Sequence, residues 1–195
     1  MSLKFSNTTS DFLEWDTMLK LTRSLFNEKN YDMSLLITLG SFWGLRISDL
    51  LNLTWTQILN SEQLEIFEKK TGKRRTIKIN AQLQKHIAEC FNAIQPRKKE
   101  SKCFLSQKGT VYSVQRINVV LKELKEKYNI KIDHFSSHSL RKTFGRAVYN
   151  NSEENAEFAL VKLSELFNHS DIRTTRKYLG LRNEELMETY ELLQF

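Results

Sequence analysis

The segment LEIFEKKTGKRRTIKI, residues 64–79, holds two short apolar runs on either side of a basic turn. The two runs are Leu64-Glu65-Ile66-Phe67 and Thr76-Ile77-Lys78-Ile79, and Thr71-Gly72 lies between them. Short runs of this kind around a glycine-containing turn are typical of a β-hairpin. The segment therefore predicts a small antiparallel sheet of two strands.

Outside this hairpin the chain predicts helices. One proline and six glycines interrupt the 195 residues, and apolar residues recur at helical spacing. The spacing predicts helices at 12–25, 31–42, 47–53, 81–94, 113–128, 138–149, 157–167 and 183–193, with a short one from Ser170. Asp11 followed by Glu14 is typical of a helix start, and Asn150–Asn155 is the expected loop. We expect an α+β fold, mainly helical, with a small antiparallel β-sheet in one domain spanning residues 1–195.

The composition excludes several classes of protein. Hydrophobic residues make up 40% and charged residues 27% of the chain, which is typical of a folded domain. The chain contains no run of about 20 apolar residues and no apolar signal-peptide core near its start, so we predict no membrane association. Cys90 and Cys103 predict reduced thiols in a cytoplasmic protein. His134 and His138 are four residues apart, but His134 is expected in a loop, so we predict no metal site.

The net charge of +7 is concentrated in the middle of the chain. Residues 1–60 carry a net charge of −1, residues 61–149 one of +12, and residues 150–195 one of −4. The densest basic run is Lys69–Lys78, in the predicted hairpin. A solvated basic surface is one explanation of such a run, and binding of a polyanion is the other.

One segment with suitable chemistry is GLRISDLL, residues 44–51. Arg46 follows a glycine break and lies near a helix start, where backbone N–H groups also favour anions. Asp49, three residues later, is expected on the same helical face, where its carboxylate fixes the guanidinium. A surface Arg–Asp pair without function remains an alternative.

Two further segments carry histidines. In SSHSLR, residues 136–141, His138 and Arg141 share one helical face beside a start that Ser137 caps. In FNHSDIRTTRKYL, residues 167–179, His169 precedes Tyr178 by nine residues. The flanking basic residues Arg176 and Lys177 create a positive field that favours the phenolate form of the tyrosine. A core tyrosine beside a solvated basic turn is the alternative.

Four segments, in order, resemble the motifs of tyrosine recombinases, the phage-integrase family. They are GLRISDLLNLTW, KKTGKRRTIKI, HSLRKTF and NHSDIRTTRKYL. The resemblance extends from about Thr17 to the C-terminus, and four motifs in order are specific where each one alone is weak. The family's catalytic positions match Arg46, Lys70, His138, Arg141, His169 and Tyr178.

The resemblance implies a site-specific recombinase or integrase of a mobile element that needs no metal or cofactor. Tyr178 is expected to attack the scissile DNA phosphate, which forms a 3′-phosphotyrosyl link and releases a 5′-hydroxyl. Arg46 and Arg141 are expected to hold the non-bridging oxygens.

The resemblance also implies roles for the other matched residues. Lys70 is expected to protonate the leaving 5′-oxygen. Lys69 and Lys73 are competing candidates, and the 24-residue step from Arg46 favours Lys70. His138 is expected to exchange the tyrosine proton, while His169 hydrogen-bonds the phosphate.

Double-stranded DNA is the implied partner. Basic residues near the matched positions are candidates for contacts with the DNA backbone, and they are Lys69, Lys73, Arg74, Arg75, Lys142, Arg173 and Arg176. An apolar stripe at residues 186–195 is a candidate terminal helix that docks on a neighbouring protomer, as in relatives that assemble as tetramers on DNA.

The chain departs from the family pattern at two positions. Asn168 stands where the family often has glycine, which puts the backbone of that turn in question, and Lys142 stands where it often has histidine. Two alternatives stay open, a DNA-binding module of the same fold that does not cleave and an enzyme of the type IB topoisomerase kind. Relatives place a helical DNA-clamping domain before the catalytic part, and only about 16 residues precede the first matching helix here, so we expect the catalytic domain alone.

Overall fold

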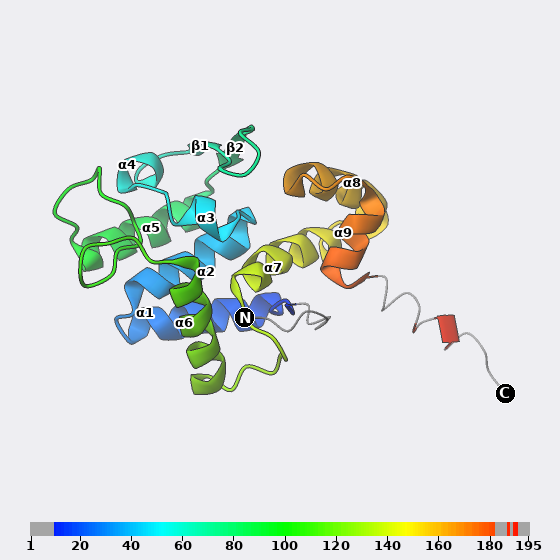
Figure 1. Cartoon of the computed structure of the whole chain (residues 1–195), viewed down its shortest axis with the longest axis horizontal. Helices are drawn as coiled ribbons and strands as arrows, with labels where there is room; N and C mark the ends of the chain where they lie inside the picture. Colours follow the sequence, from blue (N-terminus) through cyan, green and yellow to red (C-terminus); the bar gives the residue numbers. More distant parts are fainter. Residues whose placement is uncertain (1–9, 182–186, 188, 191–195) are drawn as a thin grey trace.

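Helix α2 (Tyr31–Trp43) forms the centre of the molecule, because it is apolar around nearly its whole circumference and almost every residue in it is buried. The computed structural model describes residues 10–181, 187, 189 and 190. Helices α1 (Trp15–Asn27), α5 (Ala81–Ile94) and α7 (Ser137–Asn150) pack against α2, as Figure 1 shows. Together with α6 (Val114–Lys127) they enclose the main apolar core.

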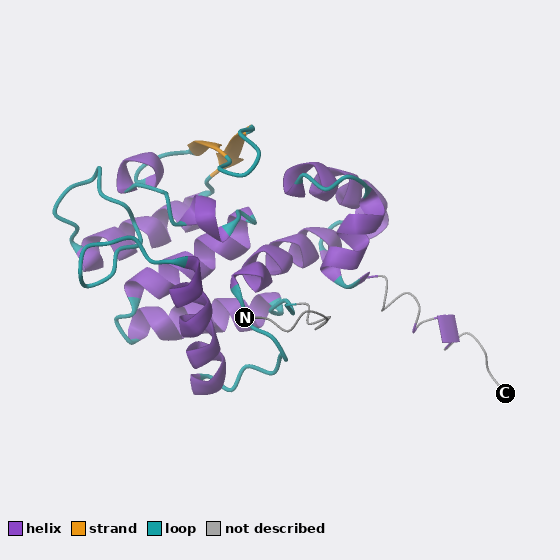
Figure 2. Cartoon of the chain, in the orientation of Figure 1, coloured by secondary structure: helices purple, strands orange, loops and turns teal. Residues whose placement is uncertain are grey.

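The hairpin consists of β1 (Gln63–Phe67) and β2 (Arg74–Lys78) in an antiparallel pair. These two strands are drawn in orange in Figure 2. Leu64 of β1 pairs with Ile77 of β2, and both side chains face the core. Opposite the turn of the hairpin lie α8 (Ala156–Phe167) and α9 (Ile172–Leu179), which form a second apolar cluster with the end of α7 (Figure 1).

Most of the predicted elements are confirmed. The predicted helix at 81–94 has the same bounds as α5, and the predictions at 31–42, 113–128, 138–149 and 157–167 differ from α2, α6, α7 and α8 by one or two residues. The expected loop at 150–155 contains a short 3₁₀ helix at Glu153–Asn155. The predicted helix at 183–193 falls almost entirely outside the described residues.

One predicted helix start and one predicted helix end are wrong. The carboxylate of Asp11 does not begin a helix but accepts hydrogen bonds from the backbone N–H groups of Asp133 and His134, and α1 starts at Trp15. The predicted helix at 47–53 is α3 (Ile47–Leu50), after which a turn leads to α4 (Trp55–Ile58). Thr54 and Gln57 form a capping box there, which starts a new helix instead of extending the old one.

The end of α2 depends on Gly44, which adopts a left-handed conformation with φ of +56°. A Cβ atom at this position would lie 2.4 Å from Cδ1 of Phe144 in α7, much closer than atoms can pack. Glycine is therefore required for both backbone and packing reasons. This break turns the chain so that Arg46 follows directly at the start of α3.

Neither cysteine forms a disulfide, because Cys90 and Cys103 are both free and buried. This agrees with the predicted reduced thiols. Among the described helices, none combines the length and the apolar character that a membrane span requires.

We expect Gly44→Ala to destabilise the protein more than Gly72→Ala does. Both glycines have positive φ, but a Cβ at Gly72 would meet no atom within 4 Å. The left-handed backbone alone costs alanine about 1–2 kcal/mol at either position. At Gly44 the clash with Phe144 adds roughly 1–3 kcal/mol. Urea unfolding of both variants measures the difference, and equal losses of unfolding free energy would show that the contact with Phe144 relaxes without cost.

Candidate active site

Arg46 lies at the N-terminal end of α3, immediately after the glycine break. Its Nη1 atom is 2.5 Å from Oε2 of Glu68, at the end of the hairpin's first strand, and its Nη2 atom donates to the Phe167 carbonyl oxygen at 3.2 Å. The Arg46 side chain is 21% exposed and the Glu68 side chain only 5%. The arginine therefore joins the hairpin to α8 while keeping one side open to solvent.

Arg141 projects from the first half of α7 and is buried. Its Nη1 atom donates to the Gly44 carbonyl oxygen, and its guanidinium carbon lies 4.3 Å from the centre of the Phe167 ring. Burial, together with the charges of Arg46 and Arg75, lowers the pKa of Arg141 to about 10. The group therefore remains charged at neutral pH.

Arg75 completes a group of three guanidinium groups. Its Nη2 atom donates to the Trp43 carbonyl oxygen at 2.6 Å, and its Nη1 atom lies 3.6 Å from Oε1 of Glu68. The carbonyl groups that hold these arginines belong to residues at the C-terminal ends of α2 and α8. Helix C-termini carry partial negative charge and unpaired carbonyl groups, so they favour cations.

Tyr178 lies in α9 against two rings. Its ring centre is 5.3 Å from that of His169 and 5.5 Å from that of Phe167, both in edge-on contact. His169 Nδ1 is 3.0 Å from Oγ1 of the buried Thr175, which orients the imidazole. The structure thus brings the predicted histidine and tyrosine of the fourth motif together.

The predicted phenolate is wrong for the protein without DNA. Burial raises the pKa of Tyr178 to about 12 and outweighs the opposing charges of Arg141 and Arg46. The flanking Arg176, which was expected to supply part of the field, forms an ion pair with Glu157. The Tyr178 hydroxyl is protonated at neutral pH, and its oxygen lies 3.5 Å from the His138 carbonyl oxygen.

His138 lies in the first turn of α7. The cap of this helix is Ser136, whose hydroxyl accepts from the His138 N–H, and not Ser137 as predicted. Ser136 and Ser139 form a reciprocal capping box, which leaves Ser137 as the first helical residue. Desolvation and the charges of Arg141 and Lys142 lower the pKa of His138, so its imidazole is neutral at pH 7.

Asn168 occupies the position at which the family often has glycine. It ends α8 in the left-handed conformation, with φ of 53° and ψ of 49°. Asparagine tolerates this conformation better than most residues other than glycine. The turn before His169 therefore keeps the left-handed backbone that a glycine would adopt, although asparagine replaces glycine there.

The three candidate lysines lie in the hairpin turn and are exposed. Lys73 donates from Nζ to Oδ1 of Asn168 at 2.5 Å. Within the described part of the chain, the ammonium groups of Lys69 and Lys70 contact no acceptor. Lys70 follows Glu68 by two residues, so the Arg46–Glu68 ion pair holds the start of its turn beside the arginines.

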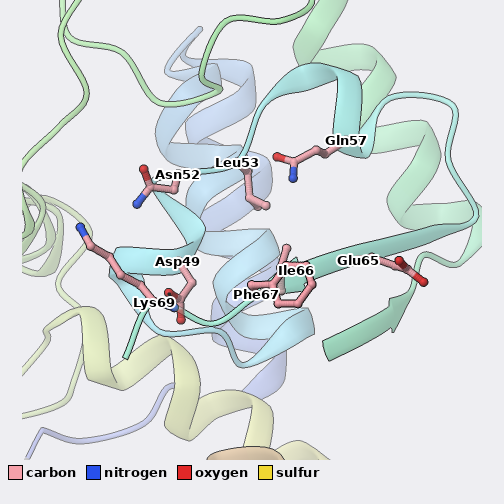
Figure 3. A pocket seen from close by; sticks show the side chains of 8 residues that line it. All are labelled: Asp49, Asn52, Leu53, Gln57, Glu65, Ile66, Phe67 and Lys69. Atoms are coloured by element: carbon pink, nitrogen blue, oxygen red, sulfur yellow. Dashed lines mark hydrogen bonds between the residues drawn. The ribbon is translucent and has the colours of Figure 1, made fainter. Parts of the chain in front are cut away.

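Asp49 does not fix Arg46, contrary to the prediction. Its Oδ1 atom accepts from the backbone N–H of Lys69 at 2.9 Å, and Arg46 pairs with Glu68 instead. Figure 3 shows Asp49 beside Lys69 in a pocket that α3, α4 and β1 line. Asp49 therefore anchors the hairpin turn to α3.

Two candidate DNA contacts lie below the surface, and their contact with DNA stays a prediction. Arg75 has a side chain only 10% exposed, and Lys142 is buried with its Nζ atom 5.3 Å from the centre of the Tyr178 ring. Neither side chain lies on the surface in this structure. Lys69, Lys73, Arg74 and Arg173 are exposed, and Arg74 pairs with Glu65 at 2.6 Å.

Glu68 is the residue that the sequence interpretation missed. The inward positions of β1 alternate through Leu64 and Ile66, and one more step along the same alternation reaches Glu68. An acidic residue at an inward position of a basic segment requires a buried cation as a partner. That alternation was the available signal. In the part of the chain that the structure describes, no group of three or more potential metal ligands occurs.

The fold and the site define a protein of the tyrosine recombinase class. The chain belongs to the phage integrase family, whose model matches residues 12–185. It is 29% identical over 170 residues to the probable integrase/recombinase YoeC of Bacillus subtilis strain 168, covering 86% of this chain and 87% of that protein. It is 28% identical to the tyrosine recombinase XerC of Pelobacter propionicus, covering 92% of this chain but only 58% of that protein.

Solved structures with this fold include the XerA recombinase, with a TM-score of 0.72 and 18% identity. That match covers 96% of this chain and 67% of XerA. The XerH recombinase in a post-cleavage complex with a difH substrate has a TM-score of 0.69 and 19% identity, covering 94% of this chain and 53% of XerH. At such identities the structures show the fold.

We expect the imidazoles of His138 and His169 to titrate below the ordinary value of about 6.5. Desolvation and then the Arg141 charge lower the pKa of both. Since the unfolded chain binds these protons more readily, their contribution to the free energy of unfolding is present near pH 7 and is lost as the pH falls below about 6.5.

NMR titration of the imidazole signals measures this directly. Arg141→Gln removes a positive charge and is expected to raise the pKa of both histidines, whereas Arg23→Gln, on the exposed face of α1, leaves them unchanged. Unchanged histidine pKa values in Arg141→Gln would show that desolvation alone causes the shift.

Proposed function

We propose that this chain cleaves and rejoins DNA at a specific site through a covalent bond to Tyr178, as the catalytic domain of an integrase or recombinase. One observation carries the proposal. Phe167 contacts Arg46 through its carbonyl oxygen, and its ring contacts Arg141, His169 and Tyr178. A nucleophile and the groups that stabilise a phosphate thus surround a single residue.

The phenol oxygen of Tyr178 attacks the scissile phosphorus, and the bond from phosphorus to the 5′-oxygen breaks. The guanidinium groups of Arg46 and Arg141 bind the non-bridging oxygens, on which charge develops during attack. The product is a 3′-phosphotyrosyl link, and attack by a 5′-hydroxyl reverses the step. The positive charge that the reaction needs comes from these side chains, so the proposed reaction requires no metal ion.

Two proton transfers accompany the bond changes. A phenol with a pKa of about 12 must lose its proton during attack, and a neutral imidazole is suited to accept it. His138 is the candidate acceptor because it matches the family position to which this role belongs, and its backbone carbonyl lies 3.5 Å from the hydroxyl. Lys70 donates the proton that the 5′-oxygen gains, and His169 hydrogen-bonds the phosphate.

The exposed lysines and arginines of the hairpin supply the proposed contacts to duplex DNA. Family membership and the charge of +12 on residues 61–149 support this partner. We also propose action in the cytoplasm and self-assembly on DNA through the C-terminal segment. Of that apolar stripe, Met187 and Tyr190 are described and exposed, and its other members lie outside the described residues.

A nicked duplex that carries the cognate site, taken from DNA flanking the gene, tests the nucleophile. We expect the wild-type chain to form a covalent complex in EDTA, and Tyr178→Phe to form none. Tyr149→Phe is a matched control that should retain the complex. Equal trapping by Tyr178→Phe would overturn the assignment.

The same assay separates the alternatives. Binding without any adduct by the wild-type chain indicates a DNA-binding module. Relaxation of supercoiled DNA without recombination indicates topoisomerase activity.

The general acid is tested with a duplex in which sulfur replaces the bridging 5′-oxygen. Thiols have pKa values near about 8.5, far below those of alcohols, so a thiolate leaves without a proton. We expect Lys70→Ala to slow cleavage of ordinary DNA by roughly 10²–10⁴-fold and to cleave the sulfur duplex at the wild-type rate.

Lys69→Ala and Lys73→Ala serve as comparisons, since both lysines lie in the same turn. Recovery on the sulfur duplex by one of these variants, in place of Lys70→Ala, would move the acid to that lysine.

A further inference from the structure

Glu68 is a buried carboxylate at the centre of the site, 4% exposed, with no part in the proposed chemistry. Its Oε2 atom accepts from Arg46 at 2.5 Å and from the Thr71 hydroxyl at 3.0 Å, while Oε1 faces Arg75 at 3.6 Å. Three side chains from two segments therefore converge on this group.

The backbone of Glu68 also closes the hairpin turn. Its N–H donates to the Lys73 carbonyl oxygen at 3.0 Å, and its carbonyl oxygen accepts from the Gly72 N–H at 2.7 Å. These bonds do not involve the carboxylate. A change confined to the side chain therefore leaves the turn that carries Lys70 closed and alters the contact with Arg46.

The electrostatics show why a carboxylate occupies this position. Burial alone would raise the pKa of Glu68, but the hydrogen bond and charge of Arg46 outweigh it, and the pKa lies below its usual value. Glu68 is thus ionised among guanidinium groups that otherwise repel one another. Removal of its charge would leave these buried cations with less compensation.

The geometry of Arg46 limits what Glu68 can do. A guanidinium carries five N–H donors, and Glu68 and the Phe167 carbonyl take one each. Three donors remain for a phosphate. A carboxylate so placed repels a phosphate, so any benefit it brings to the reaction has to pass through the arginine.

We infer that Glu68 is a positioning residue for strand cleavage, which holds the Arg46 guanidinium in the orientation that binds the scissile phosphate. This inference rests on the proposed function. Glu68→Gln keeps the shape of the side chain and removes its charge. With saturating DNA, we expect the single-turnover cleavage rate to fall on the order of 10²-fold, as for other misplaced binding groups, while the affinity for DNA changes little.

Two measurements distinguish positioning of Arg46 from a general effect on the fold. The slower cleavage by Glu68→Gln should persist on the duplex with a bridging sulfur, because this substitution leaves proton donation by Lys70 unchanged. In an Arg46→Ala background, Glu68→Gln should add less than a twofold loss, since residues that act as a unit are not additive. A structural role would instead give the same loss in both backgrounds.

Glu123→Gln is the matched control. Glu123 also pairs with an arginine, Arg116, at 3.4 Å, but both side chains are more than half exposed. It should cleave at the wild-type rate. If Glu68→Gln does not fold, Glu68→Asp tests the inference instead. This variant keeps the charge but withdraws the carboxylate from Arg46, so we expect the cleavage rate to fall about tenfold.

The outcomes separate the two hypotheses. If the wild-type chain forms no covalent complex, the proposed function fails and the inference fails with it. If the wild-type chain cleaves and Glu68→Gln cleaves at the same rate, the proposed function stands and the inference is overturned. Full recovery of Glu68→Gln on the sulfur duplex would also overturn it, because the effect would then act through Lys70.

Discussion

The arrangement of the site depends on the packing of three guanidinium groups, those of Arg46, Arg75 and Arg141, around one carboxylate. Cations removed from water need fixed acceptors. The fold supplies these as Glu68 and as carbonyl groups at the ends of α2 and α8. The helix ends therefore do more than connect elements. The break after Trp43 exposes two carbonyl groups at once, and each of them binds an arginine from a different part of the chain.

A second constraint is the packing of Phe167 at the end of α8. Its ring contacts Arg141, His169 and Tyr178, so one apolar side chain packs against a guanidinium group, an imidazole and a phenol. The same packing desolvates Tyr178 and keeps its hydroxyl protonated. In the proposed reaction this phenol therefore has to lose its proton to a base during attack.

Local signals predicted the hairpin and most helices, because alternation, glycine breaks and helical spacing act within a few residues. They failed where distant segments compete for a partner. Helical spacing paired Asp49 with Arg46. In the structure Asp49 accepts from the Lys69 N–H, and Arg46 donates to Glu68. The phenolate prediction counted the charges next to Tyr178 along the chain and left out burial. The catalytic roles of the six motif residues stay predictions.

The positive charge of residues 61–149 therefore consists of two populations with different physics. The Arg75 side chain is only 10% exposed and Arg141 and Lys142 are buried, where a low effective dielectric strengthens the action of a charge on its neighbours. Lys69, Lys70, Lys73 and Arg74 are exposed, where salt screens them and they suit the DNA backbone. A count of charges along the sequence cannot separate these populations. Salt should weaken the second far more than the first, so binding and cleavage respond differently to ionic strength.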